Sequence, residues 1–142
     1  MEKLKKMLEL HEGKRDFGYM IDGKLHIGIG RNIDVDGGLG LSDEEIGILL
    51  DNDIVRTMRE LASSFSWYSQ LDEVRQDALV MIAFNLGLTR LRKFVLALTA
   101  LEEGNYVKAK IEFLDSLWST QVGQRAVTLA TMIETGEYPD GE

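Results

Sequence analysis

The stretch "HEGKRDFGYMIDGKLHIGIGRN", residues 11–32, decides the fold of the N-terminal part of the chain. Within it, residues 25–30 read "LHIGIG", and the alternation of apolar residues with histidine and glycine predicts a β-strand. The dipeptide Asp22-Gly23 favours a two-residue hairpin turn, because both central positions of such a turn need positive φ. We therefore expect two antiparallel strands that meet at this dipeptide.

The predicted hairpin fixes which side chains share a face of the sheet. A two-residue turn at this dipeptide pairs Tyr19 with His26, and directly opposed residues lie on the same face. Gly28 and Gly30 follow His26 at alternate positions and belong to that face. Since glycine has no side chain, a ligand could approach the backbone closely beside the imidazole.

The rest of the chain has helical patterning. Residues 3–12 predict a short amphipathic helix that Gly13 ends, so Glu12 lies at its C-terminal end. Ser42 and Glu45 form a capping box that begins a helix reaching about residue 62. Further helices are predicted with apolar residues at helical spacing over 91–101, 107–118 and 122–133.

The segment "LDEVRQDALVMIAFNLG", residues 71–87, loses its polar face after the first turn and predicts a buried central helix. The expected fold class is α+β, with a small N-terminal antiparallel sheet over about 13–35. A mostly helical body over about 42–135 is built around the buried helix. We expect one domain over residues 1–142, since a chain of this length fits a single domain.

Composition excludes several classes of function. The chain has no cysteine and two histidines, so a disulfide framework is impossible and we expect no metal site and no cofactor. A net charge of −8 argues against nucleic-acid binding, which needs a basic face. The N-terminal residues contain no long apolar run, so we expect neither a signal peptide nor stable membrane insertion.

Residues 12–32 resemble the start of the phage-type lysozymes, the muramidase endolysins that include the T-even phage enzyme. Glu12, Gly13, Tyr19 and the "IGIG" of 27–30 carry this resemblance. Residues 71–87 resemble the family's central helix, and "LDSLWSTQVGQRA" (114–126) resembles a late segment with Trp118, Gln121 and Arg125. The resemblance implies a lysozyme-like fold and cleavage of the bond between N-acetylmuramic acid and N-acetylglucosamine in bacterial peptidoglycan.

The resemblance also assigns catalytic positions. Glu12 matches the family's acid, and a helix C-terminus favours the protonated form that a proton donor needs. His26 stands where the family has threonine. The second carboxylate position falls on Met20 or Ile21, with Asp22 as the nearby acid. The alternatives are a surface glutamate for Glu12, a turn residue for Asp22 and an outward-facing strand residue for His26.

The imidazole of His26 could serve catalysis in three ways. It could position the attacking water, remove a proton from that water, or attack the sugar carbon itself. Attack by water inverts the anomeric centre, whereas attack by histidine retains it through a covalent intermediate. The sequence leaves these routes open.

The resemblance further implies substrate-binding roles for Tyr19, Phe84 and Arg125. Phe84 is equally compatible with a core position, and Arg125 with a surface position on a helix. The resemblance also pairs Arg31 with Asp53 in a salt bridge, which would be structural.

As an endolysin, the protein would be a monomer that stays in the host bacterial cytoplasm until a holin lets it reach the wall. Two other readings compete with a muramidase. Glu12 working alone, as acid and then base, would make a lytic transglycosylase. An altered catalytic set together with an acidic charge would suit a lysozyme scaffold that only binds the cell wall or has a structural role.

Overall fold

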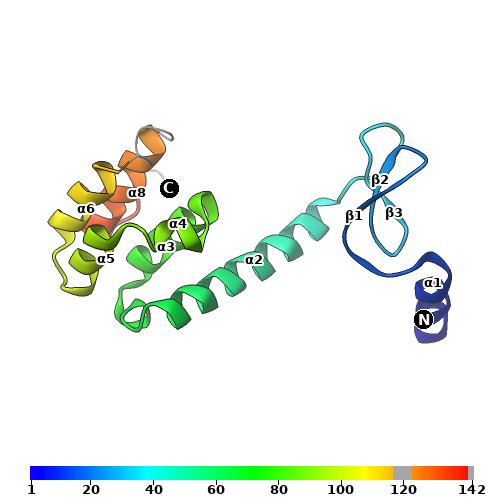
Figure 1. Ribbon diagram of the computed structural model, residues 1–142, viewed down its shortest axis with the longest axis horizontal. Coiled ribbons are helices and arrows are strands. Elements are labelled where there is room, and N and C mark those ends of the chain that lie inside the picture. The colour runs from blue at the N-terminus through cyan, green and yellow to red at the C-terminus, as the bar shows by residue number, and fades with distance from the viewer. Residues whose placement is uncertain (117–122, 141–142) are drawn as a thin grey trace. The chain divides into compact units, whose positions relative to one another are not determined.

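The computed structural model of the protein describes residues 1–116 and 123–140 (Figure 1). The chain forms two compact units, Met1–Leu50 and Asp51–Glu142. The first contains a small antiparallel sheet and the second is helical, which confirms the predicted α+β, lysozyme-like fold class. One domain over 1–142 stays a prediction. Within the described ranges, no helix has both the length and the apolar character to cross a membrane.

The N-terminal unit contains the predicted hairpin. Its elements are α1 (Glu2–Glu12), β1 (Arg15–Ile21), β2 (Lys24–Gly28) and β3 (Arg31–Asn32), with the strands in the order β1-β2-β3. Strands β1 and β2 pair antiparallel, with Tyr19 opposite His26 as predicted. Asp22 and Gly23 have φ values of 50° and 76°, the left-handed conformation that the two-residue turn requires.

Helix α2 (Asp43–Ser64) begins in the first unit and continues into the second. The second unit then contains the short 3₁₀ helix η1 (Tyr68–Gln70), α3 (Glu73–Leu86), α4 (Leu88–Leu91), α5 (Val95–Glu102), α6 (Tyr106–Leu114) and α8 (Gln124–Thr135). Helix α3 is buried along most of its length, which confirms the predicted central helix. Its buried residues are Ala78, Leu79, Val80, Ile82, Ala83 and Leu86.

Two helix predictions need correction. The pattern over 91–101 predicted one helix, but α4 ends at Leu91 and α5 begins at Val95. Phe94 has ψ of 60°, which interrupts the helix, and its ring packs edge-on against Phe113 with 6.1 Å between the centroids. Helix α6 ends at Leu114 rather than reaching Trp118. Trp118, Gln121 and Val122 lie outside the described residues.

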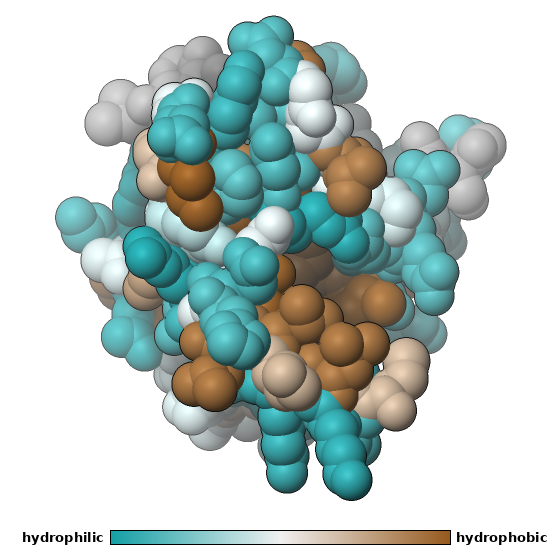
Figure 2. Space-filling model, turned by 90° about the vertical axis from the view of Figure 1, so that its right-hand side faces the viewer, coloured by the Kyte–Doolittle hydropathy of each residue, from teal (hydrophilic) through white to brown (hydrophobic). Residues whose placement is uncertain are grey.

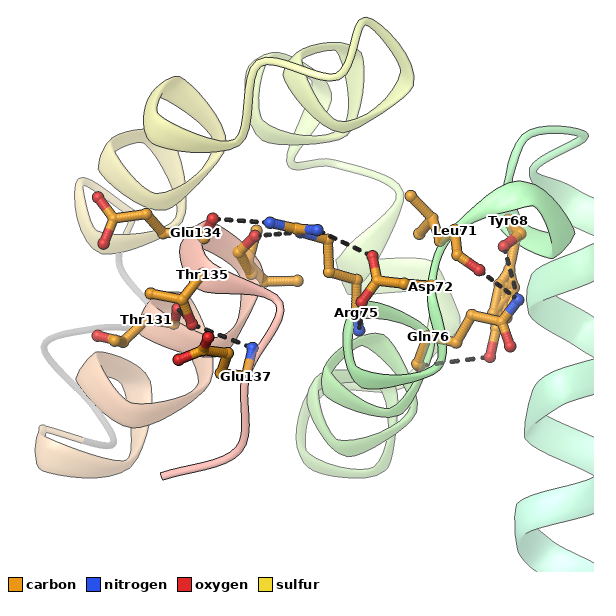
Figure 3. Close-up of polar contacts among 10 residues, drawn as sticks. Tyr68, Leu71, Asp72, Arg75, Gln76, Thr131, Glu134, Thr135 and Glu137 are labelled. Carbon is orange, nitrogen blue, oxygen red and sulfur yellow. Dashed lines mark hydrogen bonds and ion pairs between the residues drawn. The ribbon is translucent and has the colours of Figure 1, made fainter. Parts of the chain in front are cut away.

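Arg75 joins the start of α3 to the end of α8 (Figure 3). Its guanidinium donates to the carbonyls of Ile133 and Glu134 at 2.6 and 2.7 Å, and it forms an ion pair with Asp72 at 2.9 Å. It also lies over the ring of Tyr106, 3.5 Å from the centroid. Since the last carbonyls of a helix have no partner within it, Arg75 caps α8 from a neighbouring helix.

Buried residues are confined to the second unit. The core extends from Leu61 to Ile133, whereas no residue of Met1–Leu50, all of which are described, is buried. Figure 2 shows apolar side chains gathered in one area of the face that it displays, bordered by hydrophilic ones. The first unit therefore depends on hydrogen bonds, turns and ion pairs for its local geometry.

An ion pair fixes the start of α2 in the first unit. Arg31 contacts both carboxylate oxygens of Glu45, at 2.9 and 2.8 Å, and donates to the carbonyl of Gly40 at 3.1 Å. Glu45 also accepts the N–H of Ser42, and the Ser42 hydroxyl accepts the N–H of Glu45, so the predicted capping box is confirmed. The resemblance paired Arg31 with Asp53; within their own units, Arg31 binds Glu45 and Asp53 binds Arg56.

These contacts make the stability of the first unit sensitive to pH in the acidic range. The hydrogen bond from Arg31, together with the hydrogen bonds from Ser42, lowers the pKa of Glu45 from 4.5 to about 2. The stabilisation is thus fully present above pH 4.5 and is lost as the pH falls toward 2. We expect the urea concentration at the midpoint of unfolding of this unit, measured through the amide NMR signals of Arg31 and Gly40, to fall over this pH range. Glu45→Gln keeps the cap and should show a smaller fall, since only the contribution of Asp34 remains, and an identical fall in the variant would contradict the assignment.

Candidate active site

The C-terminal end of α1 places Glu12 against the sheet. The helix ends at Glu12 and is capped by Gly13, whose φ is 78° and whose N–H donates to the carbonyl of Glu9 at 2.9 Å. The exposed carboxylate of Glu12 lies beside Gly30, where a Cβ atom would stand only 3.0 Å from Oε2. Gly30 also has φ of 75°. The positive φ favours glycine at this position, and any Cβ atom here would displace the Glu12 carboxylate.

Gly30 also connects this carboxylate to the hairpin. Its N–H donates to the hydroxyl of Tyr19 at 3.0 Å. The half-buried Tyr19 faces His26, with 5.7 Å between the ring centroids. The structure thus brings together three of the predicted site residues: Glu12 and Tyr19 both contact Gly30, and Tyr19 contacts His26.

A backbone hydrogen bond fixes the chemical form of neutral His26. Its Nδ1 lies 2.9 Å from the carbonyl oxygen of Lys24. A carbonyl can only accept, so Nδ1 carries the hydrogen and Nε2 of the neutral ring has a free lone pair. A half-buried imidazole in this form has a nitrogen that can accept a proton or attack an electrophile.

Cationic side chains lie at the end of β2 next to this face. The guanidinium of Arg15 lies 4.5 Å from the centroid of the Tyr19 ring, a cation–π contact. An open hollow of 450 Å³ adjoins the strand and is lined by Lys14, Arg15, Ile27, Gly28, Ile29, Arg31 and Glu45. One glycine, three cations and the carboxylate of Glu45 border this space, so it can admit a ligand that carries hydroxyl or carboxylate groups.

Asp22 occupies the tip of the hairpin. Its φ of 50° belongs to the left-handed region, which aspartate tolerates better than most residues. His26 lies two residues along β2 from Lys24, about 7 Å, and the turn lies beyond Lys24. The turn accounts for an aspartate here, and a catalytic role for Asp22 stays a prediction.

Phe84 and Arg125 belong to the second unit. Phe84 is on α3 with 45% of its surface exposed, so it is not a core residue. Arg125 is exposed on α8 and borders a hollow of 270 Å³ together with Met81 and Tyr138. Their roles in substrate binding stay predictions.

Asp34 was not among the residues predicted from the sequence, although it contacts β2 beside His26. Its carboxylate accepts the N–H groups of Leu25 and Asp36 at 3.0 and 2.9 Å, and these bonds lower its pKa. The signal was present in "NIDVDGG", because Asn32 and Asp34 each accept the N–H two residues ahead, as these residue types do in turns. The loop after β3 is therefore tied to β2 beside His26.

The sequence matches the family model described as phage lysozyme over residues 9–132. It is 28% identical over 160 residues to "Probable T4-type lysozyme 2" of Dictyostelium discoideum, covering 94% of each chain. It is 30% identical over 69 residues to "Probable T4-type lysozyme 1" of that organism, covering 49% of this chain and 41% of the relative. It is 32% identical over 112 residues to "Pre-baseplate central spike protein Gp5" of Enterobacteria phage T4, covering 76% of this chain and 19% of the relative.

Proposed function

The chain belongs to the phage lysozyme family, and on that premise we propose that it is a muramidase. Lysozymes are glycosidases of the bacterial cell wall. The bond cleaved would be that between N-acetylmuramic acid and N-acetylglucosamine in peptidoglycan. The observation that supports this most is the placement of Glu12 and His26 around Tyr19 and Gly30, where β2 and the turn after it carry glycines at 28 and 30.

In this mechanism Glu12 donates a proton to the oxygen of the leaving sugar as the glycosidic bond breaks. Its exposed carboxylate belongs to the last residue of α1 and lies directly beside the backbone of Gly30. A glycosidase also needs a second group to complete the reaction at the sugar carbon. His26 is that group in our proposal.

His26 can act through Nε2, because Nδ1 is engaged with Lys24. If Nε2 removes a proton from the attacking water or positions that water, the configuration at the anomeric carbon is inverted. If Nε2 attacks the sugar carbon, a covalent intermediate forms and the configuration is retained. Asp22 is a secondary candidate for stabilising positive charge at the sugar. Tyr19, Phe84 and Arg125 are proposed to bind the glycan.

The biological setting follows from the same assignment. We propose a phage or prophage endolysin that acts as a monomer on the host wall and causes lysis. It would remain in the bacterial cytoplasm until a holin opens the membrane. No cofactor has a part in this mechanism.

The experiment that tests the proposed activity is incubation of the protein with purified peptidoglycan, followed by mass spectrometry of the fragments. New reducing ends of N-acetylmuramic acid are expected. Anhydromuramic ends would instead identify a lytic transglycosylase that uses Glu12 without a second group. Binding without cleavage would identify a scaffold that has lost catalysis.

Replacing His26 by alanine should lower the cleavage rate by about a hundredfold, since general base catalysis contributes roughly 10²–10⁴-fold. With the wild-type protein, the NMR spectrum of the released sugar distinguishes the two roles proposed for His26. An inverted anomer indicates that His26 directs water, and a retained anomer indicates that it attacks carbon. His11 is exposed on α1, so His11→Ala is the matched control and should keep the wild-type rate. A fully active His26→Ala variant would remove His26 from the mechanism.

A further inference from the structure

A carboxylate that the proposed mechanism does not use lies one peptide group away from His26. Oδ2 of Asp34 accepts the N–H of Leu25 at 3.0 Å. The carbonyl of the same peptide group, which belongs to Lys24, accepts Nδ1–H of His26 at 2.9 Å. Two consecutive hydrogen bonds thus join the carboxylate to the imidazole through one amide.

The position of Asp34 is fixed on its other sides. Its Oδ1 accepts the N–H of Asp36 at 2.9 Å, and its own N–H donates to Oδ1 of Asn32 at 2.9 Å. Asn32 pairs with His26 in the ladder between β2 and β3. The N–H groups of Leu25 and Asp36 keep the pKa of Asp34 below its usual value, so this carboxylate is ionised at neutral pH.

An ionised acceptor on an amide N–H polarises that amide and makes its carbonyl a stronger acceptor. A stronger acceptor at Lys24 favours the tautomer of His26 that has hydrogen on Nδ1. Other ionisable groups around the ring are Lys24 itself and Tyr19 on β1, with Arg15 over the Tyr19 ring. None of the side chains of these three residues, all of which are described, hydrogen-bonds to the amide between Lys24 and Leu25 that Asp34 and His26 share.

We infer that Asp34 is a positioning residue, which acts through this amide to hold neutral His26 with hydrogen on Nδ1 and a free lone pair on Nε2. The inference rests on the proposed role of His26 in catalysis. The arrangement gives the histidine a carboxylate partner without direct contact between the two side chains.

The test is nitrogen-15 NMR of the histidine rings at a pH where they are neutral, in the wild type and in Asp34→Asn. Wild-type His26 should be mainly the Nδ1–H tautomer. Asparagine can still accept from Leu25 but has no charge, so the ratio of Nδ1–H to Nε2–H should fall about threefold to tenfold. His11 is the chain's other histidine and serves as an internal reference that should not change.

Asp36→Asn is the matched control, because it removes the same charge from the same loop and leaves both acceptor bonds of Asp34 in place. It should keep the wild-type tautomer ratio. The amide signals of Leu25 and Ile33 report whether the loop remains on β2 in each variant, since Ile33 donates to Leu25 at 2.9 Å.

An unchanged ratio in a folded Asp34→Asn variant would overturn the inference. So would a wild-type His26 that is mainly Nε2–H, a result that needs no variant. The experiment measures the tautomer of the His26 ring and not catalysis. A protein that fails to cleave peptidoglycan can therefore still show the effect of Asp34 on His26. Failure of the proposed function and failure of this inference are thus distinguishable. In an active protein, Asp34→Asn should lower kcat more than it changes KM.

Discussion

Replacing Glu12 by glutamine is expected to lower the rate of peptidoglycan cleavage by about a thousandfold, within the roughly 10²–10⁴-fold range of general acid catalysis. Glutamine has nearly the same shape, so it can lie against Gly30 as the carboxylate does. It has no proton to give to the leaving oxygen at neutral pH. The measurement is the rate at which reducing ends appear, per molecule of folded protein.

Glu9→Gln provides the matched control. Glu9 lies three residues earlier on α1, is exposed, and contributes to the cap of Gly13 only through its backbone carbonyl. This variant loses the same charge from the same helix and should keep the wild-type rate and melting temperature. If Glu12→Gln cleaved peptidoglycan as fast as the control, Glu12 would not be the acid.

Replacing Arg75 by alanine should lower the free energy of unfolding by about 3 kcal/mol, the cost of removing one partner from a largely buried polar network. The side chain is 13% exposed and caps the carbonyls of Ile133 and Glu134. Without it, both carbonyls lose their charged donor and the ring of Tyr106 loses its stacked cation. Thermal denaturation should show a melting temperature lower by about 10 °C.

Arg56→Ala is the contrasting arginine variant. Arg56 pairs with Asp53 at 2.7 Å, but their side chains are 62% and 44% exposed. Exposed pairs of this kind contribute about 0–1 kcal/mol, so the melting temperature should change by no more than a few degrees. Equal losses in the two variants would show that the cap on α8 contributes nothing beyond an ordinary surface charge.

The sequence predicted best the features that depend on local rules. Asp22-Gly23 determined the turn and the pairing of Tyr19 with His26, because a two-residue turn fixes the register of the residues next to it. The capping box at Ser42 and the loss of a polar face along α3 were equally local signals. Periodicity failed at Phe94, because its apolar spacing fits one long helix as well as two short ones. Packing of Phe94 against Phe113 decided between them.

The features that the sequence did not predict involve bonds between distant segments. The partner of Arg31 depends on where the chain turns between Asn32 and Ser42, and no periodic pattern reports that path. Arg75 reaches carbonyls 58 and 59 residues away, and a backbone carbonyl carries no residue-type signal. Asp34 was missed for a related reason. Its side chain contacts the backbone N–H of Leu25, and a backbone group carries no signal in the sequence.

The hairpin of β1 and β2 has a consequence for the order in which the proposed site forms during folding. Its closing turn contains two residues, and the groups from Glu12 to Asp34 belong to one short continuous segment. Closing short loops costs little chain entropy, and hairpins form within about 1–10 μs. As the chain folds, the tyrosine and the histidine should therefore face each other before helices far apart in sequence have docked. The site's chemistry would then be among the first parts of the native structure to exist.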